Sequence, residues 1–548
     1  MSSNDNFSPE NDTGNIEYKW KLTNLSNKRV DQLVTQMQYR LNEGYGEAFY
    51  EIGIKDDGFP IGVDIEEFEE SVKNLERISN ECNAKISLVS KKENKDGKIL
   101  AEYLVRENND NHKYIDISIL VAGNVDAGKS STIGVLISGK KDNGRGLSRI
   151  NVFNYKHELE SGRTSSIAHQ IIGFDNNGKL VNDNSLRKLS WPEIIEESSK
   201  IITFYDLAGH EKYLRTTIFG FSSTYSDYAM ILVGANMGIT HMTKEHISLC
   251  LTYKIPFIVV ITKIDICPKE VYQETKKSIK TLLSSTGLRK LSLDIKTSED
   301  VVLASKNILN DNFVPIFSIS NVTGENLDLL KSFLNLVPLR KDLKRFDKEP
   351  IDFSIDSKYV VTGCGTVVSG ILLKGTVKVN DNVLIGPDSL GNYKKTQIKS
   401  IHHKRVPVSF VKSGSYACLC LKKIPKQWIR KGMAVLGDID KPGFVWKFEA
   451  EVSILRANHT TITKGYEPIL HVNNISQVSV IRNIVNKVSK NKKDIDTDKI
   501  VLRAGDKALV TFEFKYRPEY IKDNQRIVFR EHNLRGVGVI KKIYVGKK

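Results

Sequence analysis

The spacing of apolar residues changes twice along the chain, and each change predicts a different kind of fold. Between about residues 16 and 110 the apolar positions switch between helical and strand spacing, with a helix-like stretch at 30–41 and a strand-like one at 46–54. This pattern predicts a small α+β domain. Residues 1–15 are rich in Ser, Asn, Asp and Glu and have little to bury, so a disordered tail is expected there.

From residue 111 to 340 short apolar runs alternate regularly with helix-like sequence. The runs are β-branched and apolar on both faces, which is typical of a parallel sheet covered by helices on each side. A polar stretch at 175–199 interrupts the alternation and predicts a loop with a short helix. The five runs stand at 117–123, 200–206, 228–235, 256–263 and 314–320.

After residue 340 the long helical patterns disappear, and short strands follow one another with Gly, Asp and Asn turns between them. Two β-barrel domains are predicted, over 341–442 and 443–548. The charged segment 486–499 is expected to be a solvated loop. The predicted fold is therefore multidomain: a small α+β domain, an α/β domain with a parallel-sheet core, and two all-β barrels.

A glycine-rich segment directly after the first apolar run of the α/β domain carries the strongest chemical signal. Its sequence GNVDAGKS fits the P-loop pattern G-x-x-x-x-G-K-[ST]. The glycines let the backbone wrap a phosphate, the helix start attracts the anion, the lysine adds charge and the serine hydroxyl can bind Mg²⁺. The predicted phosphate-site residues are Gly123, Asn124, Val125, Asp126, Ala127, Gly128, Lys129, Ser130 and Ser131.

A second segment, at the end of the run 256–263, indicates which base is bound. Thr262, Lys263 and Asp265 stand there, where a base would lie. A carboxylate can accept hydrogen bonds from both N1–H and the 2-amino group of guanine, whereas adenine offers an acceptor at N1. Asp265 therefore favours GTP over ATP.

A third segment, at the end of the run 200–206, completes the predicted phosphate site. Asp206 ends the run, and Gly209 and His210 follow. A carboxylate at this position can hold Mg²⁺, the Gly209 N–H can contact a γ-phosphate, and His210 comes within reach of an attacking water.

These motifs, with two others, resemble those of the translational GTPases, and more closely the GTP-binding protein 1 group, relatives of the tRNA-carrying elongation factors. The two others are ELESGRTSS at 158–166 and SNVTGENLD at 320–328. The resemblance extends from the small N-terminal domain through both barrels, and it implies a GTPase that uses GTP, GDP and Mg²⁺.

The resemblance also implies roles that spacing alone does not supply. Thr164 is similar to a switch threonine that binds Mg²⁺ and contacts the γ-phosphate. Val125 resembles a residue that screens the water from His210, and Asp126 matches a position that binds a monovalent ion or balances charge at the phosphate site. The guanine O6 is expected at the backbone of Ser320, Asn321 and Val322. The implied catalytic residues are His210, Lys129 and Thr164, and the implied metal ligands are Ser130, Thr164 and Asp206.

The chain departs from the family at one position. Thr262 stands where translational factors usually carry Asn, a residue that bridges the base to the phosphate loop. We therefore expect a lower nucleotide affinity, while Asp265 keeps the choice of base.

The charge of the chain is concentrated in its second part. Residues 1–338 carry a net charge of −5, whereas residues 339–548 carry +21. A basic module beside a near-neutral one favours a polyanionic partner such as RNA, although a basic surface that serves solubility is the alternative. By the resemblance, the candidates for contact with tRNA are His402, His403, Lys404, Arg405 and the region 530–535.

Three function classes remain open at this point. The preferred one is a translation-associated or RNA-surveillance GTPase that binds tRNA or ribosomes, and the alternative is a GTP-gated regulator of a protein partner with little RNA affinity. A P-loop kinase is disfavoured because no phosphate-acceptor site or Arg-rich lid is visible. The chain has no apolar run of about 20 residues and no signal-like start, so a cytoplasmic monomer without membrane contact is expected.

Overall fold

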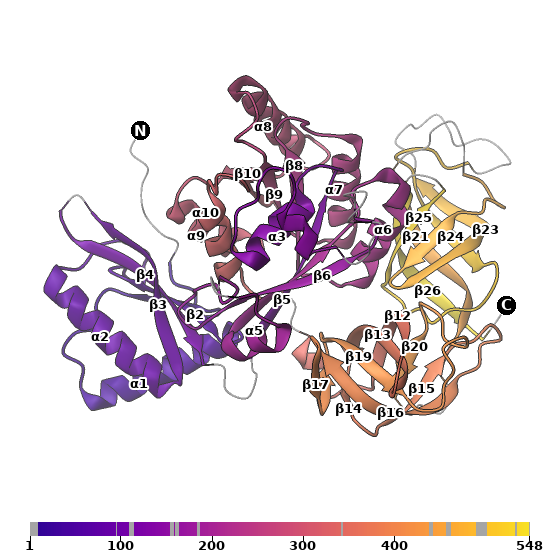
Figure 1. Cartoon of the computed structure of the whole chain (residues 1–548), viewed down its shortest axis with the longest axis horizontal. Coiled ribbons are helices and arrows are strands. Elements are labelled where there is room, and N and C mark those ends of the chain that lie inside the picture. The colour runs from indigo at the N-terminus through magenta and orange to yellow at the C-terminus, as the bar shows by residue number, and fades with distance from the viewer. Residues whose placement is uncertain are drawn as a thin grey trace.

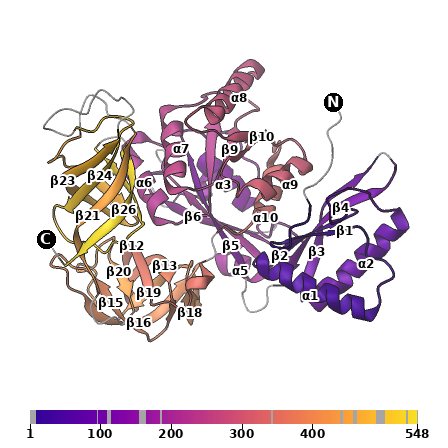
Figure 2. The ribbon, with the colours of Figure 1, turned by 180° about the vertical axis from the view of Figure 1, so that it is seen from behind.

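The computed structural model describes residues 9–94, 96–108, 114–153, 158, 164–183, 187–340, 343–437, 442–455, 462–488, 501–531 and 534–546. It consists of an N-terminal domain, a central α/β domain, and two barrels that we call the first and the second barrel (Figure 1). The central domain lies between the N-terminal domain and the barrels, and the reverse view shows the same order (Figure 2).

The N-terminal domain is a four-stranded sheet, in the order β1-β2-β4-β3, with two helices packed against it. The helices turn apolar side chains such as Leu33 and Leu75 into a core shared with the sheet. Arg40 donates to the carbonyls of Asn11 and Gly14 at 3.0 Å, so the packed chain begins before residue 16. Residues 1–8 of the predicted tail lie outside the described residues. The elements are β1 (Ile16–Lys19), α1 (Asn27–Glu43), β2 (Glu47–Ile52), α2 (Ile65–Glu81), β3 (Ala84–Glu93) and β4 (Ile99–Glu107).

The central domain is built on a seven-stranded sheet in the order β10-β11-β9-β8-β5-β7-β6. Six of its strands are parallel, which confirms the prediction from the buried apolar runs, and the edge strand β6 is antiparallel to β7. The pattern of apolar residues did not predict β6. The strands are β5 (Ile115–Gly123), β6 (Ala168–Phe174), β7 (Lys200–Asp206), β8 (Tyr228–Gly234), β9 (Phe257–Thr262), β10 (Leu291–Asp294) and β11 (Phe313–Ser318).

Helices cover both faces of this sheet and bury two separate apolar clusters. One cluster contains side chains of α3, α9 and α10, and the other contains side chains of α6, α7 and α8. The short α5 lies within the polar stretch 175–199. The helices are α3 (Lys129–Ser138), η1 (Ser148–Asn151), α5 (Trp191–Glu197), η2 (Glu211–Tyr213), α6 (Leu214–Ser223), α7 (His241–Tyr253), α8 (Lys269–Ser284), α9 (Ser298–Asn307) and α10 (Leu327–Leu336).

Both all-β parts are antiparallel sheets wrapped around apolar cores. In the first barrel the sheet order is β15-β20-β12-β13-β19-β16-β17, with a further β15–β16 pairing; in the second it is β21-β24-β23-β22-β25-β26, fully closed. Residues 489–499 of the predicted solvated loop lie outside the described residues. The elements are η3 (Lys344–Phe346), β12 (Asp352–Val361), β13 (Gly365–Lys374), β14 (Thr376–Lys378), β15 (Asn382–Gly386), β16 (Lys394–His403), β17 (Val406–Val408), β18 (Phe410–Lys412), β19 (Tyr416–Leu421), β20 (Ala434–Leu436), β21 (Val445–Ile454), β22 (Ile469–Val472), β23 (Ile475–Val488), β24 (Lys507–Phe514), β25 (Arg526–Arg530) and β26 (Leu534–Val545).

Buried charges join the N-terminal domain to the central domain. Glu47 accepts a hydrogen bond from Arg106 at 2.7 Å and another from Lys200, at the start of β7, at 3.0 Å. Arg106 also donates to the Asn335 side-chain oxygen at 2.8 Å. The three charged side chains are at most 4% exposed. Because each charge is paired and hydrogen-bonded, breaking this contact would leave a buried charge without compensation.

The first barrel meets the central domain at the basic turn between β16 and β17, where RNA contacts were predicted. Lys404 Nζ lies 2.9 Å from Asp116 Oδ1, and its side chain is only 7% exposed. The guanidinium of Arg405 lies 4.2 Å from the ring centre of Trp191. The prediction that Lys404 contacts RNA is therefore wrong, because its charge is paired between two domains.

RNA contact was also predicted for the region 530–535 of the second barrel, and a similar correction applies there. Arg530 is 8% exposed, and its Nε donates to His471 Nε2 at 3.1 Å. This buried side chain does not offer its charge to RNA, so the prediction is wrong for Arg530 as well. Residues 532–533 lie outside the described residues.

No helix within the described ranges is both long enough and apolar enough to cross a membrane.

Candidate nucleotide-binding site

The glycine-rich loop joins the end of β5 to the start of α3, as the P-loop spacing predicts. At Gly123 the backbone has φ 154°, and a Cβ there would lie 2.4 Å from the carbonyl oxygen of Leu232 on the neighbouring β8. Only glycine fits that approach. The loop ends at Gly128, where α3 begins, so the first N–H groups of the helix are available to an anion.

Lys129 is held inside this loop rather than in solvent. Its Nζ donates to the carbonyl of Asn124 at 2.9 Å, and the residue is 7% exposed. Burial lowers the pKa of Lys129, while the nearby carboxylates of Asp206 and Asp126 oppose that shift. A Cβ at Gly209 would lie 2.3 Å from the same Nζ, so the chain after β7 packs directly on the lysine.

Three side-chain oxygens converge beside the start of α3. The Ser130 hydroxyl donates to Asp206 Oδ2 at 2.6 Å and lies 2.9 Å from Thr164 Oγ1, which is 3.3 Å from the same carboxylate oxygen. Asp206 is fully buried, and its Oδ1 has no hydrogen-bond partner among the described residues. Burial raises the pKa of Asp206 to about 6, against the pull of Lys129.

This donor set fits Mg²⁺. Mg²⁺ prefers hard oxygen ligands, usually one or two carboxylates together with phosphates and water. Ser130, Thr164 and Asp206 supply two hydroxyls and a carboxylate, and Asp206 Oδ1 is a buried oxygen without a hydrogen bond. A bound cation would also favour the ionised carboxylate, reversing the effect of burial on its pKa.

Glu158 is a residue of this site that the sequence analysis missed. Its Oε1 accepts hydrogen bonds from the N–H and hydroxyl of Ser165, at 2.7 and 2.8 Å, and from the N–H and hydroxyl of Ser166, at 3.0 and 3.1 Å. The carboxylate is fully buried. Since Ser165 follows Thr164 directly, Glu158 anchors the segment that brings Thr164 to Asp206. Residues 159–163, which complete the motif ELESGRTSS, lie outside the described residues.

His210 directly precedes η2, in the segment that follows the carboxyl end of β7. Its Nδ1 accepts a hydrogen bond from the N–H of Lys212 at 3.1 Å, and its ring packs edge-on to Tyr213 with centroids 6.2 Å apart. Because Nδ1 is an acceptor here, the neutral ring carries its proton on Nε2. Val125 and Ser131 are half-buried in and after the loop.

At the base end, Thr262 forms a link to the phosphate loop, and the lower nucleotide affinity expected from the missing Asn stays a prediction. The Thr262 hydroxyl donates to the carbonyl of Ala127 at 2.9 Å, and the residue is fully buried. The end of β9 is thus tied to the phosphate loop without an Asn. Lys263 and Asp265 follow at the surface, half-buried and exposed respectively.

The loop after β11 closes the base end from the other side. The Ser320 hydroxyl accepts from the N–H groups of Val322 and Thr323, at 3.2 and 3.0 Å. The Asn321 side chain donates to Thr132 of α3 at 2.9 Å, and Val322 is 39% exposed. Buried, hydrogen-bonded residues at the foot of this loop therefore support its exposed tip.

The loops at Gly123, Asp206, Thr262 and Ser320 follow the carboxyl ends of β5, β7, β9 and β11 in one sheet, and the segment with Thr164 precedes β6, which is antiparallel to β7 and so starts at the same edge. Ligands of open α/β sheets bind at that edge. The structure thus brings the predicted phosphate residues to one end of the site, and the predicted base residues to the other.

Comparison with known proteins agrees with this arrangement. The model of the elongation factor Tu GTP binding domain matches residues 116–339, and that of the elongation factor Tu C-terminal domain matches residues 443–544. The chain is 44% identical over 530 residues to GTP-binding protein 1 of Xenopus laevis, covering 96% of this chain and 78% of that one. The chain therefore belongs to the GTP-binding protein 1/2 family. It is likewise 40% identical over 538 residues to human GTP-binding protein 2, covering 97% and 87% of the two chains.

The fold is also that of more distant translation factors. A structure of elongation factor SelB from Methanococcus maripaludis, in complex with the GTP analogue GppNHp, matches with a TM-score of 0.55 and 21% identity. The match covers 79% of this chain and 80% of that one. The chain is thus a GTP-binding protein 1/2-type member of the elongation factor Tu-like GTPases, a family that binds guanine nucleotides.

Proposed function

We propose that this chain binds GTP together with Mg²⁺, hydrolyses it to GDP and phosphate, and uses the change of nucleotide as a conformational switch. The observation that carries the proposal is the meeting of Ser130, Thr164 and Asp206 oxygens within 3.3 Å of one another beside the start of α3. Oxygen donors at a helix N-terminus suit a divalent cation and the phosphates that accompany it.

Different groups of the chain have different roles in binding and hydrolysing the triphosphate. The N–H groups of the loop before α3 donate to phosphate oxygens, and Lys129 balances the charge that builds up as the γ-phosphate leaves. When bound by Ser130, Thr164 and Asp206, Mg²⁺ supplies positive charge at the phosphate oxygens. The N–H of Gly209, in the segment packed on Lys129, contacts the γ-phosphate.

His210 orients the attacking water in this proposal. With Nδ1 occupied by the Lys212 N–H, the neutral ring presents Nε2–H, which donates a hydrogen bond to the water and holds it in line with the γ-phosphate. The family resemblance supports this role for His210, with Val125 as the side chain that screens the water from it.

The switch acts through Thr164 and the strands that follow it. Loss of the γ-phosphate removes a partner of Thr164, whose segment leads into β6, while Asp206 ends β7. His169 of β6 packs 4.7 Å from the Tyr205 ring and 5.2 Å from the Tyr416 ring of the first barrel. Movement of these strands would therefore be transmitted directly to the first barrel.

The proposed cellular role is that of a translation-associated or RNA-surveillance factor whose partner is tRNA or the ribosome. The chain is proposed to act in the cytoplasm as a monomer. The net charge of +21 over residues 339–548 supports an RNA partner. The names of relatives support translation: selenocysteine-specific elongation factor of Methanocaldococcus jannaschii is 26% identical over 330 residues, 60% of this chain and 64% of that one. The alternative, a GTP-gated regulator of a protein partner, predicts little dependence of partner binding on salt.

The test is GTP turnover by the purified chain with and without ribosomes, for the natural protein and for His210→Ala. We expect ribosomes to stimulate the natural protein and His210→Ala to lose at least tenfold of the stimulated rate, since positioning of a reacting group contributes about that or more. Equal stimulated rates would remove His210 from the mechanism, and no stimulation would favour the protein-partner alternative.

A further inference from the structure

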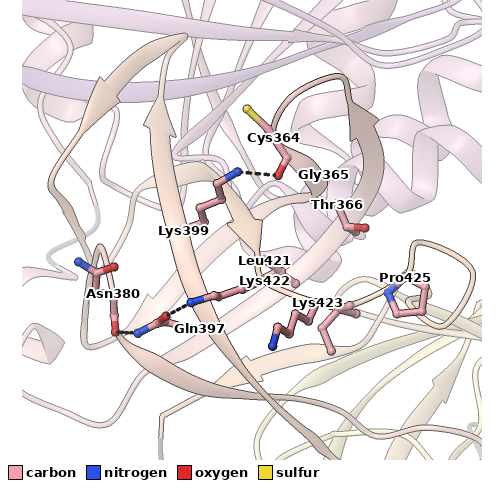
Figure 3. Close-up of a pocket in the computed structure, with 11 residues that line it drawn as sticks. Cys364, Gly365, Thr366, Asn380, Gln397, Lys399, Leu421, Lys422, Lys423 and Pro425 are labelled. Atoms are coloured by element: carbon pink, nitrogen blue, oxygen red, sulfur yellow. Dashed lines mark hydrogen bonds between the residues drawn. The ribbon is translucent and has the colours of Figure 1, made fainter.

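A cavity of about 710 Å³ opens on the first barrel, away from the nucleotide site (Figure 3). Its walls come from the hairpin between β12 and β13, from β16, and from the end of β19 with the segment that follows. None of the described residues that line it is Asp or Glu. The lining residues are Cys364, Gly365, Thr366, Asn380, Gln397, Lys399, Leu421, Lys422, Lys423, Ile424 and Pro425.

Two cysteine residues are in contact at the edge of this cavity. Cys364 lines it at the tip of the β12–β13 hairpin and is half-buried. Cys420 of β19 is 2% exposed, and its thiol donates to the carbonyl of Cys364 at 3.2 Å. Burial raises the pKa of the Cys420 thiol, a negative charge on Cys364 adds to that rise, and Lys399 opposes it. An accessible thiol and a buried one therefore belong to two residues in direct contact.

The tip of the hairpin is free to bring the two sulfur atoms together. The Cys364 sulfur points away from the carbonyl that accepts the Cys420 thiol, so a bond between the two sulfurs needs the tip to turn (Figure 3). Gly363 and Gly365 flank Cys364 at φ 80° and 103°, and a Cβ at either would meet nothing within 4 Å. Two unpacked glycines allow the backbone to turn at little cost, because glycine adopts both signs of φ.

Three exposed lysines give the cavity a positive charge. Lys399 Nζ donates to the carbonyl of Cys364 at 3.4 Å, and Lys422 Nζ donates to Gln397 Oε1 at 3.2 Å (Figure 3). Lys423 follows directly. Carbonyl and amide dipoles orient ammonium groups but do not neutralise them, so the cavity attracts small anions to the Cys364 thiol.

The rest of the lining indicates which reagent fits. Leu421, Ile424 and Pro425 add an apolar wall, and a volume of about 300–1,000 Å³ is typical of sites for small organic molecules. The disulfide of an anionic thiol peptide, such as glutathione disulfide, has carboxylates for the lysines and apolar methylene groups for the wall. A partly exposed cysteine among cations, with a second thiol in reach, is typical of redox-sensing sites.

We propose that Cys364 is a thiol–disulfide exchange site for an anionic disulfide such as glutathione disulfide, with Cys420 as the resolving thiol. The Cys364 thiolate attacks one sulfur of the reagent, a mixed disulfide forms on Cys364, and one glutathione thiolate leaves. Cys420 then gives its proton to water and attacks the Cys364 sulfur, which forms the Cys364–Cys420 bond and releases the second glutathione thiolate. Two protein thiols are oxidised, and the reagent is reduced to two thiols. The new bond joins the hairpin tip to β19, and it requires no bound nucleotide.

The first test follows the thiols of the natural chain. The reduced chain is incubated with glutathione disulfide, free thiols are blocked with N-ethylmaleimide, and the peptides are analysed by mass spectrometry. Cys82 is the control, because it is also half-buried but has a pKa raised to about 11 by burial and by Glu81 and Glu107. We expect Cys364 to react at least about tenfold faster than Cys82, since a thiol among cations meets an anionic reagent more often. The product should be a peptide cross-linked between Cys364 and Cys420.

Two single variants separate the two steps. In Cys420→Ser the mixed disulfide should persist on Cys364, because no resolving thiol remains. In Cys364→Ser the buried Cys420 should take up no glutathione. Equal rates at Cys364 and Cys82 would overturn the proposal. A natural chain that keeps glutathione on Cys364 without forming the bridge would overturn it as well.

The second test removes the charges. The variant Lys399→Gln/Lys422→Gln/Lys423→Gln is compared with Lys348→Gln/Lys378→Gln/Lys412→Gln, three exposed lysines of the same barrel outside the cavity lining. Each variant reacts with glutathione disulfide and, separately, with the uncharged 2-hydroxyethyl disulfide. We expect the cavity variant to react about tenfold more slowly with glutathione disulfide and within about twofold of the natural rate with the uncharged reagent, as for charge-steered association. The control variant should keep both rates. Equal slowing with the two reagents would show that the lysines do not recognise the anion, and would overturn the proposal.

Discussion

The two ends of the nucleotide site are built in opposite ways. At the phosphate end Lys129, Thr164 and Asp206 are at most 8% exposed, and the side chains bond to the loop or to one another. At the base end Asp265 and the tip residue Val322 stand at the surface. Only the anchors beneath them are buried, such as Thr262 with its bond to Ala127.

This difference separates two tasks. Preorganised buried groups interact strongly with charge, because water does not screen them and they need not rearrange. Exposed hydrogen-bonding groups distinguish one base from another but contribute less to affinity, because water competes for them. Changes at the phosphate end should therefore act on affinity, metal dependence and turnover, and changes at the base end on selectivity.

The largest effect is expected from Lys129→Ala. The substitution removes a buried positive charge that the proposed function places against the phosphates, and charge-assisted hydrogen bonds contribute about 1.5–3 kcal/mol each. We expect GDP and GTP affinities to fall about 100-fold, measured by titration with fluorescent nucleotide analogues. Lys263→Ala at the base end is the matched control, and a similar loss in both variants would contradict the division of tasks.

Asp265→Ala should act on selectivity. It removes the predicted acceptor of guanine N1–H and of the 2-amino group, so GDP affinity should fall about 30-fold, within the range for hydrogen bonds to a charged group. Affinity for ADP should stay as low as in the natural chain. Competition between GDP and ADP for a bound fluorescent analogue measures the ratio. An unchanged ratio would remove Asp265 from base recognition.

Glu158→Ala should slow turnover about tenfold without changing GDP affinity. The alanine releases Ser165 and Ser166, and with them the segment that positions Thr164, which matters only when the γ-phosphate is present. Glu158→Gln keeps an acceptor oxygen for the same N–H and hydroxyl groups and should restore most of the rate. Equal kcat values for the two variants would show that the carboxylate does not act through these hydrogen bonds.

The smallest effect concerns pH and Mg²⁺. Burial raises the pKa of Asp206 from its ordinary 3.8 to about 6, so without a cation its contribution to folding stability is present below pH 3.8 and lost as the pH rises through 6. A metal needs the ionised carboxylate, so apparent Mg²⁺ affinity should be about fourfold lower at pH 5.5 than at pH 7.5. The Mg²⁺-induced rise in Tm at the two pH values measures this. Asp206→Asn should show no such difference, and a larger rise at pH 5.5 in the natural chain would contradict the assignment.

Local backbone structure was largely predictable from the sequence, because short motifs encode their own backbone path. The spacing of Gly123, Gly128 and Lys129 describes a turn and a helix start, and the structure has both. Buried β-branched runs likewise predicted the parallel sheet. The edge strand β6 was missed because it lies just after the segment with Thr164, outside the regular alternation of apolar runs with helix-like sequence.

Contacts made by the fold were not predictable in the same way. From the sequence, Lys404 is expected to be a solvent-exposed charge. Its partner Asp116 lies far away in sequence, in another domain. Glu158 is one acidic residue among several, and only the return of the chain places Ser165 against it. The hydrogen bond from Thr262 to the carbonyl of Ala127 was likewise not predicted, because it depends on how closely β9 approaches the phosphate loop.

The most direct test of the central claim is equilibrium binding of fluorescent GTP, GDP and ATP analogues to the purified natural chain, with Mg²⁺ and with EDTA. The account predicts tight binding of both guanine nucleotides, displacement by unlabelled GDP but not by ADP, and a greater loss of GTP than of GDP affinity when Mg²⁺ is removed, because Thr164 and the γ-phosphate share the metal. Equal binding of the adenine nucleotide, or no retention of guanine nucleotides with Mg²⁺ present, would contradict it.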